Sequence, residues 1–457
     1  MNPLNKEILS LAIPSILANI TVPLVGMADI AVAGHLGGGN GAAALIGGIT
    51  IGTMLFDLLY WNFAFLRSGT GGLTAQAYGR LLAGSDGVDQ VHGILLRALK
   101  IALLSGVALI ALQWVVLWLA FLLVDCTPQV RELASEYFKI RIWAAPATLS
   151  LFAFKGWFIG LQDTVRPMIA DLIVNGLNIA LSFGLGFGLC GLPAMGFAGV
   201  AAGTLIAQWC GFTYAAFAAR HALGQLVDQD QDQQYTVDQV QAPSFFRMNR
   251  DLVLRSLGMI AVYIGFTVIS AKFGDTMLAV SAILMKLLLV FSYFTDGFAY
   301  AGEALTGRFI GAGDKLGVHA AVKGCFIWGW GLAGAFMLMY GLGGVPAFHL
   351  LTSDVTVVEA GREFIPWLLL MPLIGVPAFI WDGVFTGATA TSAMRDSTLL
   401  CAMGFFAVWF GGYYLTMALG KDAPVGPMAI HILMAAYFVH LAIRSIYLTL
   451  YWWRVKK

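Results

Sequence analysis

Long stretches without any charged side chain constrain this chain more than any other feature of its sequence. Residues 101 to 124 read IALLSGVALIALQWVVLWLAFLLV, and residues 8 to 28 likewise contain no Asp, Glu, Lys or Arg. A helix needs about 20 apolar residues to cross a lipid bilayer, so each stretch is long enough for one crossing. A water-soluble fold has no place for many such stretches. We therefore expect a polytopic membrane protein.

The composition supports this interpretation and excludes several classes of function. Of the 457 residues, 59% are hydrophobic and 11% are charged, whereas soluble domains carry about a quarter charged residues. The net charge of +1 provides no field for collecting nucleic acid, so no nucleic-acid partner is expected. The five cysteines are isolated and are expected to be small packing residues, with no metal site and no cofactor. The first apolar stretch lacks a small-residue cleavage site, so we expect it to be retained as a helix.

Apolar stretches between polar or Gly/Pro breaks predict twelve transmembrane helices. They cover residues 8–34, 45–78, 92–124, 130–158, 165–187, 194–220, 248–272, 277–311, 316–343, 355–387, 397–419 and 426–452. An even number of crossings places both termini on the same side of the membrane. Lys and Arg concentrate on that side, and the opposite side receives Arg131, Lys139, Arg141, Lys272, Arg362 and Lys421. The positive-inside rule then predicts cytoplasmic termini. We expect the membrane to be a bacterial inner membrane.

A polar segment near the middle of the chain separates two similar halves. The segment LGQLVDQDQDQQYTVDQVQAPS has the low apolar content of a flexible connection. NKEIL before the first helix matches NRDLV before the seventh, GLTAQAYGR matches EALTGRFIGAG, and FIGLQDT matches FTGATAT. Six crossings in each half keep both repeats in the same orientation. We expect an all-α protein with an N-terminal lobe (1–220), a cytoplasmic linker (221–247) and a pseudo-symmetric C-terminal lobe (248–457).

Three stretches carry a resemblance to a known family. They are MADIAVAGHLG in the first predicted helix, YWNFAFLRSGTGGLTAQAYGR in the second and FSYFTDGFAYAGEALTGRFIGAGD in the eighth. The chain resembles the multidrug and toxic compound extrusion (MATE) transporters over both lobes, and most closely their DinF (DNA-damage-inducible protein F) branch. The resemblance implies a V-shaped, twelve-helix exporter that expels cationic, amphipathic compounds in exchange for protons or sodium ions.

Asp29 ends the uncharged stretch of the first helix. A charged residue deep in a membrane helix costs about 2.5 kcal/mol or more and normally faces a cavity or a partner. Such a group can take up a proton or a cation on one side of the membrane and release it on the other. Alternatively, Asp29 lies at the outer end of its helix and is wetted by lipid headgroups. The resemblance places the essential helix-one Asp of the family at this position and favours the coupling site.

Asn175, Asn178 and Ser182 share one face of the fifth predicted helix, because they are three and seven residues apart. They either bond neighbouring helices together, at about 0.6 kcal/mol each, or form a polar wall opposite Asp29. In the family this helix carries an Asn followed four residues later by an Asp, but here Ser182 stands at the Asp position. Thr204 matches a family threonine. With one carboxylate instead of two, we expect protons as the coupling ion, and sodium remains the alternative.

The eighth predicted helix carries Lys286, Asp296 and Glu303. Asp296 and Glu303 share one face, whereas Lys286 lies ten residues before Asp296, about 15 Å along a helix and too far for a direct pair. Asp382 in the tenth helix is therefore the candidate partner of Lys286. These four residues either hold the C-terminal helices in register or form a secondary polar site for a proton relay or a substrate.

Prolines and aromatic residues give two further expectations. Pro14 and Pro23 should kink the first helix, and the resemblance implies bending at Pro14 as a response to protonation. Rings near the second and fourth helices either contact a cationic substrate or face lipid. These candidate cavity residues are Tyr60, Trp61, Phe63 and Phe154.

Together these features predict a monomeric, proton-coupled multidrug antiporter that works by alternating access on small amphipathic substrates within membrane lipid. A sodium-coupled drug antiporter is one alternative. A flippase for lipid-linked precursors, from the same wider superfamily, is another, but it should have a more cationic cavity than Arg67 and Lys286 provide. An intramembrane enzyme is not expected, because the sequence contains neither H-E-x-x-H nor G-x-S-x-G.

Overall fold

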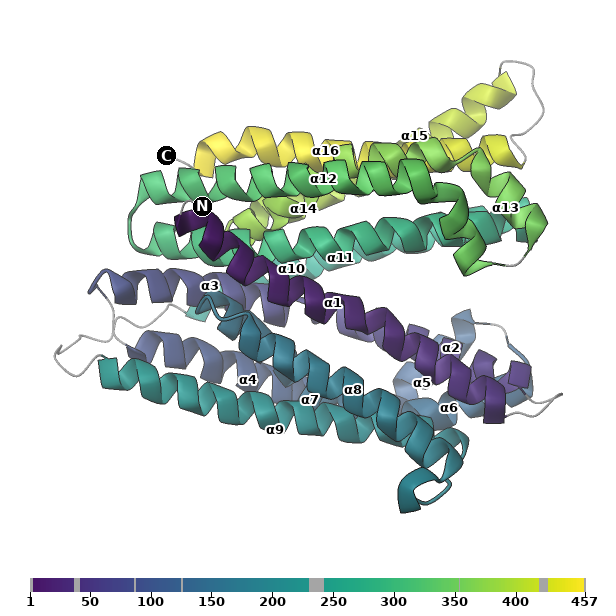
Figure 1. Ribbon diagram of the computed structural model, residues 1–457, viewed down its shortest axis with the longest axis horizontal. Coiled ribbons are helices and arrows are strands. Elements are labelled where there is room, and N and C mark those ends of the chain that lie inside the picture. The colour runs from purple at the N-terminus through teal and green to yellow at the C-terminus, as the bar shows by residue number, and fades with distance from the viewer. Residues whose placement is uncertain are drawn as a thin grey trace. The chain divides into compact units, whose positions relative to one another are not determined.

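The computed structural model describes residues 3–36, 42–85, 88–124, 126–229, 242–352, 354–418 and 426–455. These residues form helices and short turns, with no strand among them (Figure 1). The N-terminal half contains α1 (Pro3–Leu36), α2 (Ala42–Trp61), α3 (Phe65–Leu82), α4 (Val88–Ala111), α5 (Gln113–Leu123), α6 (Pro128–Arg141), α7 (Ala145–Gly160), α8 (Val165–Phe187) and α9 (Phe197–Gln229). The C-terminal half contains α10 (Ala242–Ser270), α11 (Asp275–Gly311), α12 (Lys315–Leu351), α13 (Val355–Arg362), α14 (Ile365–Gly387), α15 (Thr391–Ala418) and α16 (Pro427–Val455).

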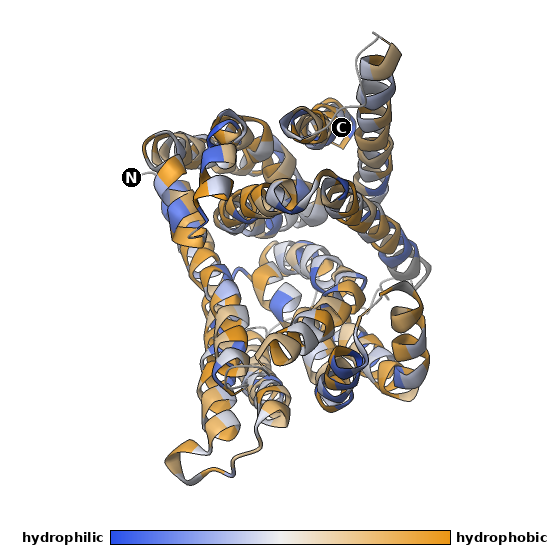
Figure 2. Cartoon of the chain, turned by 90° about the vertical axis from the view of Figure 1, so that its right-hand side faces the viewer, coloured by the Kyte–Doolittle hydropathy of each residue, from blue (hydrophilic) through white to orange (hydrophobic). Residues whose placement is uncertain are grey.

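The described part of the chain contains 12 helical segments long and apolar enough to cross a membrane, which confirms the predicted number. Hydrophobic residues, drawn in orange, are found along the helices throughout the chain (Figure 2). Large apolar side chains such as Leu342 and Leu350 are 86% exposed. A soluble monomer rarely leaves so much apolar surface in water, whereas lipid covers it at no cost. The protein is therefore an all-α, multi-pass membrane protein.

Four predicted crossings contain breaks that hydropathy alone did not locate, and one of them is the crossing at 130–158, which a 3-10 turn at Ile142–Ala144 divides into α6 and α7. The second crossing is divided into α2 and α3 by a turn at residues 62–64, where the Asn62 side-chain amide donates to the Leu58 carbonyl at 2.7 Å. Such a side-chain bond competes with the regular helical bond. The third crossing is divided at Leu112. In the tenth, α13 and α14 are separate helices, and Pro366 in the first turn of α14 has no N–H to continue a preceding helix.

α1 is assigned as one helix through both of its prolines. Nearby hydroxyl groups bond to its backbone: Ser15 Oγ donates to the Leu11 carbonyl at 3.1 Å, and Thr21 Oγ1 donates to the Ala18 carbonyl at 2.7 Å. The predicted kinks at Pro14 and Pro23 stay a prediction.

The chain divides into two compact units. The N-terminal unit is Leu17–Gln241, and the C-terminal unit combines Met1–Ile16 with Ala242–Lys457. The N-terminal lobe expected from the sequence (1–220) includes the first sixteen residues, whereas in the structure these residues group with the C-terminal unit. One of their contacts with that unit is the ion pair of Glu7 with Arg308 of α11, at 2.6 Å. The expected linker (221–247) also begins and ends within helices, since α9 continues to Gln229 and α10 begins at Ala242. Residues 230–241 lie outside the described part.

In the N-terminal unit, α8 and α9 lie side by side with their backbones close together (Figure 1). A Cβ atom added at Gly199 of α9 would lie 2.6 Å from the Leu185 carbonyl oxygen, and one added at Gly203 would lie 2.9 Å from the Ser182 nitrogen. Real Cβ atoms do not approach other atoms so closely, so only glycine fits at these points. The close approach places the polar face of α8, with Ser182, beside Thr204 of α9.

In the C-terminal unit, α11 and α14 meet in the same way. Gly383 and Gly387 of α14 face the backbone carbonyl groups of Ala299 and Glu303 in α11, and an added Cβ atom would overlap them. These contacts fix the position of Asp382 on α14 relative to α11.

Replacing Gly383 by Ala should therefore destabilise the protein by about 1–3 kcal/mol, because the new methyl group would overlap a backbone atom that cannot rotate away. Gly331→Ala in α12 is the matched control: nothing lies within 4 Å of its added Cβ atom, and the substitution should stabilise the helix by up to about 1 kcal/mol. Thermal unfolding of both variants in detergent measures the difference. Equal melting temperatures would contradict the close contact between α11 and α14.

Candidate functional site

Asp29 lies within the N-terminal unit and is 4% exposed. α1 continues beyond it to Leu36, so Asp29 does not end the helix. This burial argues against a carboxylate that is simply wetted by headgroups. A buried carboxylate in a membrane helix needs polar partners inside the protein.

The partners of Asp29 come from the polar face of α8. Ser182 Oγ lies 3.0 Å from Asp29 Oδ1 and 3.2 Å from Asn178 Oδ1. Asn178 Nδ2 donates to Thr204 Oγ1 of α9 at 3.0 Å, and the Thr204 hydroxyl donates to the Val200 carbonyl at 3.2 Å. Asn178, Ser182 and Thr204 are as buried as Asp29. Four of the predicted site residues thus form one hydrogen-bonded chain across three helices.

The chain can accommodate Asp29 in either protonation state. Ser182 has one hydroxyl hydrogen and two oxygen neighbours, so it donates to only one of them at a time. When Asp29 is ionised, Ser182 can donate to the carboxylate. When Asp29 is protonated, its own hydrogen can be donated to Ser182, which is then free to donate to Asn178. Asp29 can therefore take up a proton without a clash between its own hydrogen and the Ser182 hydroxyl hydrogen, because the Ser182 hydrogen can turn to Asn178.

Asn175 is not part of this chain. Its Nδ2 donates to Thr21 Oγ1 at 2.6 Å, earlier on α1. It therefore forms a second hydrogen bond between α8 and α1, in addition to the bond between Ser182 and Asp29. For the three polar residues of α8, the sequence left open a role in bonding neighbouring helices together. Asn175 has this role, because its bond to Thr21 holds α8 against α1, the helix that carries Asp29.

Arg141 is the residue of this site that the sequence analysis missed. Its guanidinium lies close enough to both Asp29 and Asp57 to interact with them electrostatically. It is held by a hydrogen bond to Tyr137 Oη at 2.9 Å and by the ring of Phe56, whose centroid lies 4.7 Å from the guanidinium carbon. The sequence placed Arg141 on the outer side of the membrane. Its position inside the apolar segment 128–160 was the available signal.

Comparison with known proteins identifies the family. A family model described as MatE matches residues 14–183 and 252–405, well over half of the chain. The chain belongs to the MATE family.

Individual relatives support this assignment. DNA damage-inducible protein F of Escherichia coli (strain K12) is 33% identical over 424 residues, which cover 91% of this chain and 88% of that protein. A probable multidrug resistance protein NorM of Rhizobium meliloti (strain 1021) is 25% identical over 428 residues, or 90% of this chain and 85% of that one. Both the predicted MATE membership and the DinF branch are confirmed.

Solved MATE structures share the fold. A crystal structure of MATE in complex with MaL6 superimposes with a TM-score of 0.79 at 19% identity and covers 99% of this chain and 96% of that chain. An outward-facing multidrug resistance MATE transporter gives a TM-score of 0.73 at 18% identity, with the same coverage. Because MATE proteins are transporters of small molecules, the chain is a transporter and not an enzyme.

The predicted aromatic cavity residues of this MATE protein do not gather in one place. Tyr60 is buried in a core with Phe56, and Phe63 packs at the edge of that same core. Phe154 belongs to a separate buried cluster, and Trp61 is exposed. These environments cannot be separated from the sequence, because all four residues lie in or next to apolar helices.

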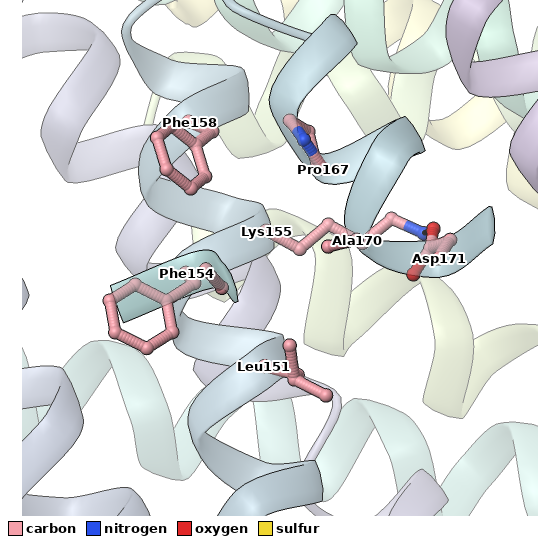
Figure 3. A pocket seen from close by; sticks show the side chains of 8 residues that line it. Leu151, Phe154, Lys155, Phe158, Pro167, Ala170 and Asp171 are labelled. Carbon is pink, nitrogen blue, oxygen red and sulfur yellow. Dashed lines mark hydrogen bonds and ion pairs between the residues drawn. The ribbon is translucent and has the colours of Figure 1, made fainter. Parts of the chain in front are cut away.

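Phe154 lines a pocket between α7, α8 and α9, in which the Lys155 side chain reaches across to Asp171 (Figure 3). The two charges are 2.7 Å apart. The pocket measures about 210 Å³ even with its open side included, whereas sites for drug-sized ligands begin at roughly 300 Å³. It is too small to be the substrate cavity.

In the C-terminal unit, Asp382 is held by two arginines. Arg255 of α10 donates to Asp382 Oδ2 at 2.5 Å, and Arg444 of α16 donates through Nε to Oδ1 at 3.2 Å and also pairs with Oδ2. Arg444 is 1% exposed and interacts electrostatically with Asp296 of α11. Asp382 and Asp296 thus balance the two arginines.

The predicted pairing of Lys286 with Asp382 is wrong. Both carboxylate oxygens of Asp382 are occupied by guanidinium groups, and within the described residues no ion pair joins it to Lys286. The Lys286 side chain is exposed on α11, where a long chain can extend its ammonium group toward a polar region. Glu303 is fully buried on the same helix. The four residues predicted as a secondary polar site therefore do not form one site.

Asp382→Asn should destabilise the C-terminal unit by about 3–5 kcal/mol, because it leaves the buried guanidinium of Arg444 and the partly buried one of Arg255 without their shared carboxylate. The double variant Asp382→Asn/Arg255→Met removes one of the two positive charges and should recover part of this loss. Thermal unfolding of the single and double variants in detergent measures both effects. A single variant as stable as the wild type would show that the pairs contribute nothing.

Proposed function

We propose that this MATE protein is a proton-coupled multidrug antiporter that exports lipophilic, mostly cationic compounds by alternating access. The proposal depends on one observation: a buried carboxylate, Asp29, on a membrane-spanning helix, bonded to a chain of neutral polar groups. Membership of a family of multidrug transporters supplies the class of substrate.

The charges around Asp29 suit an exchange of cations. Arg141 interacts with two carboxylates, Asp29 and Asp57, and these three side chains together have an excess of one negative charge when both acids are ionised. That excess attracts a cationic substrate. When a proton binds to Asp29 the excess disappears, and the substrate is no longer held. Proton uptake on the outer side and proton loss on the inner side would therefore drive export.

The same arrangement favours protons over sodium. A sodium ion needs several oxygen ligands, and a site with two carboxylates would attract it more strongly than a site with one. Here Ser182 supplies a hydroxyl instead of a second carboxylate, and the Thr204 oxygen already accepts a hydrogen bond from Asn178 Nδ2.

In the C-terminal unit, two of the candidate acids, Asp382 and Asp296, are already close to arginines. Two guanidinium groups contact Asp382, and Asp296 interacts with Arg444. We therefore place ion coupling in the N-terminal unit. We further propose a bacterial inner-membrane location with cytoplasmic termini, because Lys and Arg concentrate on the side of the termini, and a monomer surrounded by lipid, because one chain supplies both units.

Asp29→Asn should abolish efflux of a fluorescent cationic dye from proteoliposomes under an imposed pH gradient, because the amide cannot take up a proton. Asp275→Asn is the control, since Asp275 is an exposed carboxylate in the first turn of α11. The control should transport at the wild-type rate. Size-exclusion chromatography verifies that both variants are folded.

Two results would contradict the proposal. Transport by the wild type under a sodium gradient alone would identify sodium as the coupling ion. Normal pH-driven transport by a folded Asp29→Asn variant would show that Asp29 is not the coupling residue.

Ser182→Asp should add sodium-driven transport, because it places a second carboxylate beside Asp29, Asn178 and Thr204. Ser182→Asn has a side chain of the same size without the charge and serves as the matched control. Dye efflux under a sodium gradient at equal pH measures the gain. If both variants respond to sodium equally, or neither does, the number of carboxylates does not determine the choice of ion.

A further inference from the structure

The first turns of α1 belong to a different unit from the rest of the helix. Met1–Ile16 groups with the C-terminal unit, whereas Leu17 onward, including Asp29, groups with the N-terminal unit. α1 is one continuous helix across this division. Any movement of one unit relative to the other must therefore either bend α1 or release its first turns from the C-terminal unit.

An ion pair at the start of α1 holds these turns. Arg308, near the end of α11, contacts both carboxylate oxygens of Glu7, with Nη1 at 2.6 Å from Oε1 and Nη2 at 3.1 Å from Oε2. The parallel arrangement of two N–H groups and two oxygens gives a specific fit between guanidinium and carboxylate. The ring of Phe309 lies beside the guanidinium, with its centroid 4.4 Å away.

Apolar contacts continue along the same face of α1. A Cβ atom added at Gly297 of α11 would lie 2.5 Å from the Ile16 side chain and 2.7 Å from the Ala12 carbonyl oxygen. One added at Gly324 of α12 would lie 2.5 Å from the Ile8 side chain. The first turns of α1 thus pack closely against Gly297 of α11 and Gly324 of α12, and we call these two contacts the glycine seat. The ion pair of Glu7 with Arg308 lies next to the glycine seat, near the start of α1.

The internal repeat provides a comparison within the same molecule. NKEIL before the first crossing matches NRDLV before the seventh, so Glu7 corresponds to Asp251. Asp251 pairs with Arg395 of α15 at 2.7 Å, within its own half of the chain, and is 4% exposed. Glu7 pairs with a residue of the opposite half and is 32% exposed. A pair in contact with water is more easily broken than a buried one.

We propose that Glu7 and Arg308, together with the glycine seat for Ile8 and Ile16, form a latch that opens and closes during each transport cycle. The latch holds the start of the helix that carries Asp29, and its release allows α1 to move with the N-terminal unit. The inference rests on the proposed alternating-access function. Asp251 and Arg395 form the corresponding permanent pair, which stays closed.

Reversible cross-linking tests whether opening is required. In a variant without the native cysteines, Glu7→Cys and Arg308→Cys are joined by a reducible bifunctional thiol reagent, since a direct disulfide needs closer Cα atoms than a long ion pair provides. Dye efflux should be lost on cross-linking and restored by reduction. The control joins Asp251→Cys to Arg395→Cys with the same reagent and should keep its transport rate. Unimpaired transport with Glu7→Cys and Arg308→Cys joined, or equal loss in the control, overturns the latch.

A distance measurement tests the same movement without relying on transport. Spin labels at Lys6→Cys and Leu316→Cys, both exposed, report the separation of the start of α1 from α12. Changing the pH or adding dye should produce a second, longer distance. The control pair, Arg250→Cys with Leu316→Cys, should keep one distance because neither residue lies on α1 and Arg250 is next to Asp251, whose pair with Arg395 stays closed.

The two measurements separate the latch from the proposed function. A single Lys6–Leu316 distance under every condition overturns the latch, even if pH-driven efflux is normal. A second distance in a protein that exports no dye supports the latch and contradicts the proton-coupled drug antiport.

Discussion

A charge inside a membrane must find its partners within the protein, and this requirement accounts for the arrangement of both units. In the C-terminal unit, two arginines and two carboxylates balance one another around Asp382. In the N-terminal unit, one arginine interacts with two carboxylates, Asp29 and Asp57. The contacts of Arg255 and Arg444 with Asp382 resemble a structural cross-link between helices, whereas Asp29, which is bonded to neutral polar groups, can change its charge by binding a proton. The two halves of the repeat thus use similar chemistry for different purposes.

Close helix contacts make this arrangement possible. The hydrogen bond between Asn178 and Thr204 joins α8 to α9, and those helices can approach because Gly199 and Gly203 have no side chains. Lipid provides no hydrophobic force between helices, so small residues and polar bonds determine how membrane helices associate. The glycines therefore contribute to the site indirectly: a larger residue at Gly203 would separate the hydroxyl groups that α8 and α9 bring together.

The sequence predicted the elements of this structure better than the contacts between them. Hydropathy identified all 12 crossings, and the helical spacing of Asn178 and Ser182 correctly placed them on one face, beside Asp29. Hydropathy does not give the rotation of one helix against another. For that reason Lys286 was assigned to Asp382, although its side chain faces away, and Arg255 and Arg444 were not considered. Arg141 was missed because a charge count assigns residues to sides of the membrane, not to neighbours.

The serine at position 182 connects the charge balance to the stoichiometry of exchange. With a single titrating carboxylate, the group around Asp29 changes by one unit of charge, so one proton can replace one monovalent cationic substrate without a net movement of charge. A second carboxylate would leave a negative charge after one proton had bound, and complete release would require another cation. Under the proposed exchange, a pH difference alone then supplies the driving force for a singly charged substrate. Because Ser182 carries a hydroxyl group instead of a carboxylate, the site binds a metal ion less strongly. For the same reason, one proton is enough to neutralise the site.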